Sequence, residues 1–147
     1  MTSFDPDIFL NTEIEGALET KFTPVPAGEH SAFINEITMR EVNESPVLRV
    51  TWKIPDDALA EELGVEDVQV QDDLFLDVEE DGRLQFGPNR NIKLGRLRDA
   101  LGQNKPGETW GFNQLRGAGP VKLIVSHQFS KTGEGPFARV DKYQTTA

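Results

Sequence analysis

The feature that most constrains the fold is a run of strict alternation between residues 48 and 54. Four apolar side chains in this run are each separated by one polar or positively charged residue: Leu48, Val50, Trp52 and Ile54. A period of two is expected of a β-strand with one buried and one exposed face. The pattern therefore places Trp52 in the core, and it places Arg49 and Lys53 on the outer face of the strand.

Four further segments have strand-like patterns: residues 29–42, 68–78, 121–129 and 137–143. Two helices are also expected. Residues 56–63 carry acids in the first turn and stop at Gly64. Residues 90–102 carry an apolar stripe of Leu94, Leu97 and Leu101 at helical spacing. Asp81-Gly82 predicts a hairpin turn after the third strand.

Five strands with a helix between the third and the fourth is the element order of the OB-fold, a small Greek-key barrel. Small sandwiches and SH3-like barrels also use five or six strands, and the position of the helix favours the OB-fold. We predict an all-β fold with minor α: a five-stranded OB-fold-like Greek-key barrel over residues 28–147. Residues 1–27 are predicted to be an N-terminal extended arm, because Pro24 and Pro26 favour an extended connector. The arm packs either on its own domain or on a second copy.

Charge is divided unevenly along the chain. Residues 1–81 carry 21 acidic and 4 basic side chains, a net of −17, and residues 82–147 carry 4 acidic and 11 basic ones, a net of +7. The net charge of −10 therefore hides a basic half. Such asymmetry favours a polyanion-binding surface on one side and a repelling or partner-binding surface on the other. We expect the basic residues to gather on one side of the barrel.

Several classes of site are not expected. Cysteine is absent and the two histidines lie far apart in the sequence, so no metal site is predicted. Residues 77–82 open like a calcium loop, but Pro88 stands where a bidentate Glu is required. No nucleophile triad or carboxylate pair stands out, so we expect no enzyme and no cofactor. The N-terminus lacks a signal-peptide pattern and the apolar runs are strand-sized, so no membrane partner is expected.

Three segments together resemble a known family. They are residues 91–104, the later Trp110, Phe112, Leu115 and Gly117, and residues 22–29. This combination resembles phage-encoded single-stranded-DNA-binding proteins, small OB-fold proteins of replication modules. The resemblance implies a non-catalytic protein that coats single-stranded DNA during phage replication or recombination, in the cytoplasm of an infected bacterium. Many such proteins end in an acidic tail, whereas this chain has no acid after Asp141.

Non-specific binding of single strands needs cations for the phosphates and aromatic faces for the bases. The predicted nucleic-acid-binding residues are Arg49, Lys53, Arg90, Lys93, Arg96, Trp110, Lys122, Lys131, Phe137, Arg139 and Tyr143; Lys142 belongs to the same basic half. On the last strand, Phe137, Arg139 and Tyr143 share a parity that we expect to face outward. Trp110 either stacks on bases or plugs the bottom of the barrel.

Two other function classes remain open. In the first, the acidic half mimics nucleic acid or docks a basic partner, which includes phage or host replication proteins. In the second, the protein is a phage assembly or structural protein that uses the arm, and a homo-oligomer is compatible with this arrangement. The predicted partner of the basic half is single-stranded DNA.

Overall fold

The computed structural model describes residues 5–146, so residues 1–4 of the predicted arm and Ala147 lie outside the described residues. The elements are α1 (Pro6–Leu10), β1 (Gly28–Val42), β2 (Ser45–Ile54), α2 (Asp57–Leu63), β3 (Val68–Phe75), α3 (Ile92–Ala100), the 3₁₀ helix η1 (Phe112–Leu115), β4 (Val121–Gln128) and β5 (Phe137–Thr145). The five strands, α2 and α3 follow the predicted order, whereas the short helices α1 and η1 were not predicted. The all-β class with minor α, the five strands and the helix between strands 3 and 4 are confirmed.

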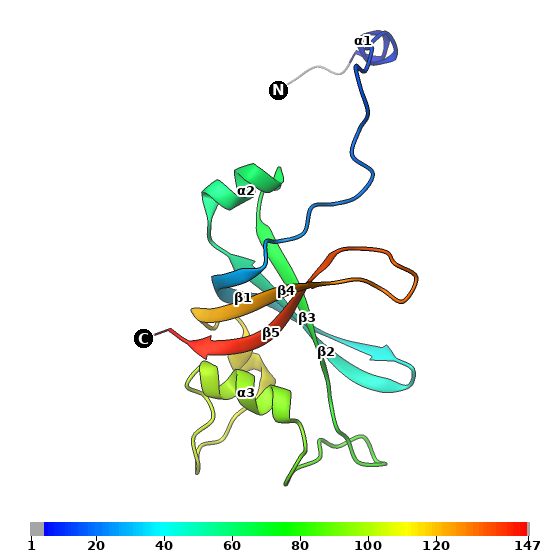
Figure 1. The fold of residues 1–147 in the computed structure, drawn as a ribbon. Helices are drawn as coiled ribbons and strands as arrows, with labels where there is room; N and C mark the ends of the chain where they lie inside the picture. The colour runs from blue at the N-terminus through cyan, green and yellow to red at the C-terminus, as the bar shows by residue number, and fades with distance from the viewer. Residues whose placement is uncertain (1–4, 147) are drawn as a thin grey trace.

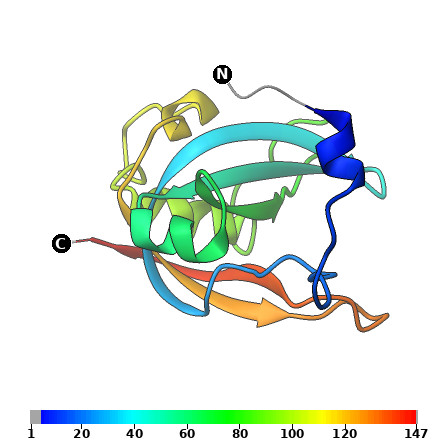
Figure 2. The same ribbon diagram turned by 90° about the horizontal axis from the view of Figure 1, so that it is seen from above.

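The five strands form one antiparallel sheet in the order β3-β2-β1-β4-β5. The sheet is strongly curved, so that its edge strands β3 and β5 turn toward each other (Figures 1 and 2). Side chains bridge these two edges, and no backbone pairing joins them among residues 5–146. This partly open arrangement agrees with the predicted OB-fold-like class. Helix α3 lies beneath β5, at the opposite end of the molecule from α2 (Figure 1).

Two β-bulges change which residues face the interior. In β1 the register with β2 shifts between Ile34 and Glu36. Ala32 and Ile34 are buried before this shift and Ile37 after it, which explains why the parity of this strand is blurred in the sequence. In β5 the pairing with β4 passes from Val140 directly to Lys142, which leaves Asp141 as the extra residue. One extra residue reverses the parity of everything beyond it.

The core lies between the curved sheet and helix α3. Trp52 of β2 is fully buried, as predicted, and Leu94 and Leu97 of α3 pack into the same cluster. Helix α2 begins at Asp56, whose carboxylate accepts from the Leu59 amide at 3.0 Å, and it ends at Gly64 in the left-handed conformation with φ 68°. β3 ends at Phe75, three residues earlier than expected. The predicted Asp81-Gly82 turn is closed by a single bridge between Val78 and Leu84.

The arm leaves the sheet at the start of β1. Its residues 5–23 are exposed throughout, and only the short helix α1 interrupts their extended path (Figure 1). The root of the arm is fastened to the barrel. Val25 is buried, and its carbonyl accepts from His127 Nε2 at 2.7 Å. The arm beyond this root extends away from α3.

Candidate functional site

A groove between helix α3 and strand β5 gathers four of the nine cations that the sequence singles out. It has a volume of about 570 Å³, and its charged lining consists of Lys93 and Arg96 from α3, Arg139 and Lys142 from β5, and the acids Asp99 and Asp141. Four cations face two acids, so the lining is net positive in a protein whose total charge is −10. We call it the α3–β5 groove.

The start of α3 is held by one asparagine. Asn91 precedes the helix, and its side-chain Oδ1 accepts from the Asp77 amide at 2.8 Å while its backbone amide donates to the Asp77 carboxylate at 2.7 Å. Its Nδ2 also donates to the Gln85 carbonyl at 2.8 Å. These bonds tie the helix to the segment that follows β3. With Leu94 and Leu97 buried, Lys93 and Arg96 are left on the flank that faces β5.

The bulge at Asp141 decides which β5 side chains face the groove. Before the bulge, Phe137 and Arg139 point outward, as predicted, and Val140 is buried. After it, Lys142 takes the outward position and Tyr143 turns toward the core. The expectation that Tyr143 faces outward with Phe137 and Arg139 is therefore wrong, because a simple period of two does not count the extra residue. The outer face of β5 presents Phe137, Arg139 and Lys142.

Tyr143 belongs to a buried polar contact that closes the barrel. Its phenol donates to Asp72 Oδ2 on β3, and its ring centroid lies 5.9 Å from that of Trp52. Lys93 Nζ of α3 donates to the other oxygen of Asp72 at 2.7 Å. Burial, together with the charge of Asp72, raises the pKa of Tyr143 well above its usual range. The phenol therefore stays neutral and keeps the proton that it donates to Asp72 in the hydrogen bond. Asp72 joins β3, β5 and α3.

The cations of the α3–β5 groove differ in how far their charge is already neutralised. Lys93 is paired with the buried Asp72, and Arg139 Nε lies 3.3 Å from Asp141 Oδ1 on its own strand. Arg96 and Lys142 make no ion pair within residues 5–146, and both are exposed. These two are the charges most readily offered to an anionic ligand. Lys93 positions α3 rather than reaching outward.

The structure divides the remaining predicted cations among other surfaces. Arg49 and Lys53 lie on the outer face of β2, where Arg49 makes a two-pronged bond to Asp73 and Lys53 Nζ lies 3.3 Å from Asp67. Lys122 Nζ lies 3.5 Å from Glu29 Oε2. Lys122 belongs to β4, the strand that pairs with β5. Arg90 and Lys131 are exposed and do not line the α3–β5 groove. The basic half therefore does not form one continuous surface with Arg49 and Lys53.

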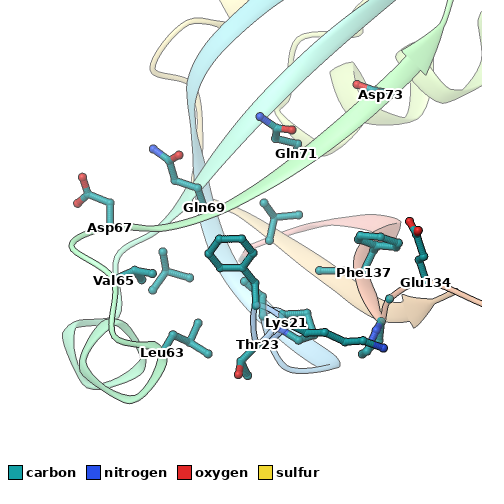
Figure 3. Close-up of a pocket in the computed structure, with 18 of the residues that line it drawn as sticks. Lys21, Thr23, Leu63, Val65, Asp67, Gln69, Gln71, Asp73, Glu134 and Phe137 are labelled. Atoms are coloured by element: carbon teal, nitrogen blue, oxygen red, sulfur yellow. The ribbon is translucent and has the colours of Figure 1, made fainter. Parts of the chain in front are cut away.

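A second and larger groove, of about 1150 Å³, lies beside the edge strand β3 (Figure 3). Its walls come from the outer face of β3, the end of α2, the root of the arm and the β4–β5 loop. Gln69, Gln71, Leu63, Val65 and Phe137 are among the side chains that line it. Its charged lining is Asp67, Asp73 and Glu134 against Lys21 and Arg49. We call it the β3 groove, and unlike the α3–β5 groove it carries a net negative charge.

Asp73 gives the wall of the β3 groove a pH-dependent bond. Arg49 Nε and Nη2 donate to its two oxygens at 2.9 and 3.1 Å, and this hydrogen bonding lowers the pKa of Asp73 below its ordinary value. The same bond raises the pKa of Arg49. A carboxylate with a depressed pKa stabilises the fold at pH values above its unfolded pKa, and the stabilisation is lost as the pH falls through the folded one.

We therefore expect Asp73→Asn to cost about 1 kcal/mol of unfolding free energy at neutral pH, as for a well-formed surface ion pair. The difference from wild type should shrink as the pH falls below about 4, where the carboxylate becomes protonated in the unfolded chain. Urea denaturation of both proteins at several pH values measures this difference in unfolding free energy. Glu79→Gln, at an exposed acid of the 79–82 turn for which no ion pair is found within residues 5–146, is the matched control. A difference that stays constant down to pH 3 would contradict this role of the ion pair.

The two predicted aromatic ligands outside the core have different environments. Trp110 is half-buried: its Nε1 donates to Gln103 at 2.8 Å, Arg98 lies 4.4 Å from its ring centroid, and Phe112 packs against its edge. This ring packs against the core cluster, which favours the plug alternative. Phe137 is 49% exposed on β5, and it is the predicted aromatic that a base could reach.

Some features of the site were not predicted. Asp72 occupies the apolar parity of β3 between Val70 and Leu74, and an acid in such a stripe is the signal that could have identified it.

Residues 5–146 contain no group of acidic and histidine side chains able to hold a metal ion. The same residues include no helix whose length and apolar character would let it cross a membrane.

Comparisons with protein-family models and with curated proteins find no match for this chain.

Proposed function

We propose that the protein binds single-stranded DNA without catalysis, with the phosphates lying along the α3–β5 groove. The observation that carries the proposal is the pair of unneutralised cations, Arg96 and Lys142, which face the same groove from two elements. Arg139 lies on the same strand face, and Phe137 follows it toward the β4–β5 loop. A row of cations ending in an exposed aromatic ring suits a flexible single strand.

The expected mode of binding is largely independent of sequence. Arg96 and Lys142 would neutralise successive phosphates and release their counterions, which makes the affinity fall as salt is added. Phe137 would offer its face to one base, and every base has a π-face to stack on it. Single strands exposed during phage replication or recombination, in the bacterial cytoplasm, are the substrate class that the family resemblance implies.

The acidic half is the basis of the rival proposal. Several of its acids are bonded within the chain: Asp67 to Lys53, Asp72 to Lys93, and Asp73 to Arg49. Within residues 5–146, the exposed Glu61, Glu62, Glu79 and Glu80 have no such partner. A mimic of nucleic acid or a dock for a basic protein would use that surface and would leave DNA unbound. Phage or host replication proteins are the class of partner to expect there.

We expect R96Q/K142Q to weaken binding of dye-labelled oligo-dT by at least about tenfold at low salt. The plot of log affinity against log salt should become shallower by about 1.4, since each phosphate contact on a single strand contributes about 0.7. Fluorescence anisotropy at several salt concentrations measures both quantities. The label belongs on the DNA because Trp52 is fully buried and Trp110 is half-buried against the core.

The matched control is K105Q/R116Q, which removes the same charge from two exposed residues that line neither groove and have no ion pair within residues 5–146. It should keep the wild-type salt dependence. If both double variants lose affinity equally, only the net charge matters and the groove assignment is wrong. If the wild-type protein leaves oligo-dT free at low salt, DNA binding itself is refuted and the acidic-surface alternative takes its place.

A further inference from the structure

The arm exposes more apolar surface than an isolated chain would be expected to leave in water. Between residues 8 and 22, six large apolar side chains are 65–98% exposed: Ile8, Phe9, Leu10, Ile14, Leu18 and Phe22. The last four recur every fourth residue. A contiguous exposed apolar stretch of this size marks an interaction site. The apolar residues supply a driving force for association, although they do not identify the partner surface.

Charge distinguishes between the possible receiving surfaces. The side chains of residues 5–23 include five acids and one lysine, a net of −4: Asp5, Asp7, Glu13, Glu15, Glu19 and Lys21. The β3 groove has three acids and only two cations, one of which, Lys21, belongs to the arm itself. The α3–β5 groove has four cations and two acids. Electrostatic complementarity selects partners and orientation, so the acidic arm fits the α3–β5 groove.

The arm in the structure does not reach the α3–β5 groove of its own chain. It leaves the barrel at the end opposite α3 and runs away from it (Figure 1). A second copy offers the same groove without that restriction. Two exposed apolar side chains lie on the elements that form the groove: Ile92, next to Lys93 on α3, is 46% exposed, and Phe137, two residues before Arg139 on β5, is 49% exposed. Neither lines the groove itself, and Phe137 also lines the β3 groove. They give the apolar residues of an incoming arm a surface to cover.

We propose that the acidic, apolar arm of one copy docks in the α3–β5 groove of a second copy. Arms exchanged about a two-fold axis would bury both apolar stretches in one closed dimer. The arm uses the same cations as the proposed DNA site, so self-association and DNA binding compete. The inference does not depend on DNA binding, because self-association is measured in the absence of DNA.

Sedimentation velocity over a range of protein concentrations tests the proposal, using the full chain. The wild-type protein should associate reversibly in roughly the micromolar range, as expected of a modest interface. E13Q/E15Q/E19Q in the arm and R96Q/K142Q in the groove should each weaken association by roughly tenfold. The control variant E62Q/E79Q/E80Q also removes three acidic charges, but from exposed positions outside the arm. It should leave association unchanged.

Two further measurements identify the contact. I14S/L18S keeps every charge, alters only exposed arm residues and should abolish association. Added salt should weaken association, since opposite charges are screened. A wild-type protein that stays monomeric throughout overturns the proposal. Association that strengthens with salt, or that responds equally to the arm and control variants, also overturns it, because the arm would then not be held by the cationic groove.

Discussion

Replacing Tyr143 with alanine is expected to lower the free energy of unfolding by about 3–5 kcal/mol, the usual cost of removing a packed aromatic side chain. The ring packs against Trp52, and its hydroxyl donates a hydrogen bond to Asp72. The substitution therefore opens a cavity and removes the hydrogen bond that links β5 to β3. Phe137→Ala, on the same strand but half exposed, is the control and should cost only about 0.5 kcal/mol. Urea denaturation of both variants measures the difference. Equal costs would contradict the inward orientation of Tyr143.

The hydroxyl of Tyr143 can be examined separately. Tyr143→Phe keeps the ring and should cost about 1–3 kcal/mol, because Asp72 loses a hydrogen-bond donor inside the protein. Since the folded-state pKa of Tyr143 is raised, its contribution is complete below the unfolded pKa of about 10 and is lost as the pH rises above it. Wild-type stability should therefore fall above about pH 10 more steeply than that of Tyr143→Phe.

Absorbance gives an independent check, because Tyr143 is the only tyrosine of the chain. The phenolate signal should remain absent above pH 10 while the protein is folded and should rise as it unfolds. A tyrosine that titrates normally in the folded protein would mean that Tyr143 is exposed, as the alternation of β5 had predicted.

Gly119→Ala is expected to be the other severe substitution, with a cost of several kcal/mol from backbone strain and overpacking. Gly119 has φ +138°, which a side chain disfavours, and an added Cβ would lie 2.9 Å from the carbonyl oxygen of Ala32 and 3.0 Å from Phe33 Cα. Neither of those backbone atoms can move without disturbing β1 near its bulge. The neighbouring Ala118 carbonyl also accepts from the Ile34 amide at 2.8 Å.

Gly95→Ala is the matched control for this substitution. Gly95 lies within α3, has ordinary helical geometry, and an added Cβ would meet nothing within 4 Å. The change should stabilise the protein by about 0.5–1 kcal/mol through helix propensity. Thermal or urea denaturation should therefore move in opposite directions for the two variants. A Gly119→Ala variant as stable as Gly95→Ala would contradict the close approach of Gly119 to the backbone of β1.

The elements of the fold could be predicted because their signals are local. Alternation in β2 fixes Trp52 as a core residue, Asp56 and Gly64 bound α2, and the Leu94 and Leu97 stripe fixes the buried side of α3. Each of these follows from residues within a few positions of one another. The sequence patterns therefore also predicted the element order and the class.

The candidate site was only partly predictable. Lys93, Arg96 and Arg139 were predicted as cations of one surface, and they do line one groove with Lys142. Arg49 and Lys53, also predicted, lie on the outer face of β2 beside acids of β3 and the segment before it. Whether a cation is already neutralised depends on its neighbours in space, and sequence distance does not give these neighbours.

By itself, the sequence determined which segments form strands and helices, where the charge is concentrated and which segment forms the acidic, apolar arm, because propensity, turn chemistry and charge belong to individual residues. The tertiary structure alone decided which way Tyr143 faces and which cations remain available. Asp72 and Tyr143 lie 71 residues apart, and the bulge at Asp141 depends on register with β4. Register and ion pairing are set by packing between distant segments, and one extra residue in a strand exchanges its two faces.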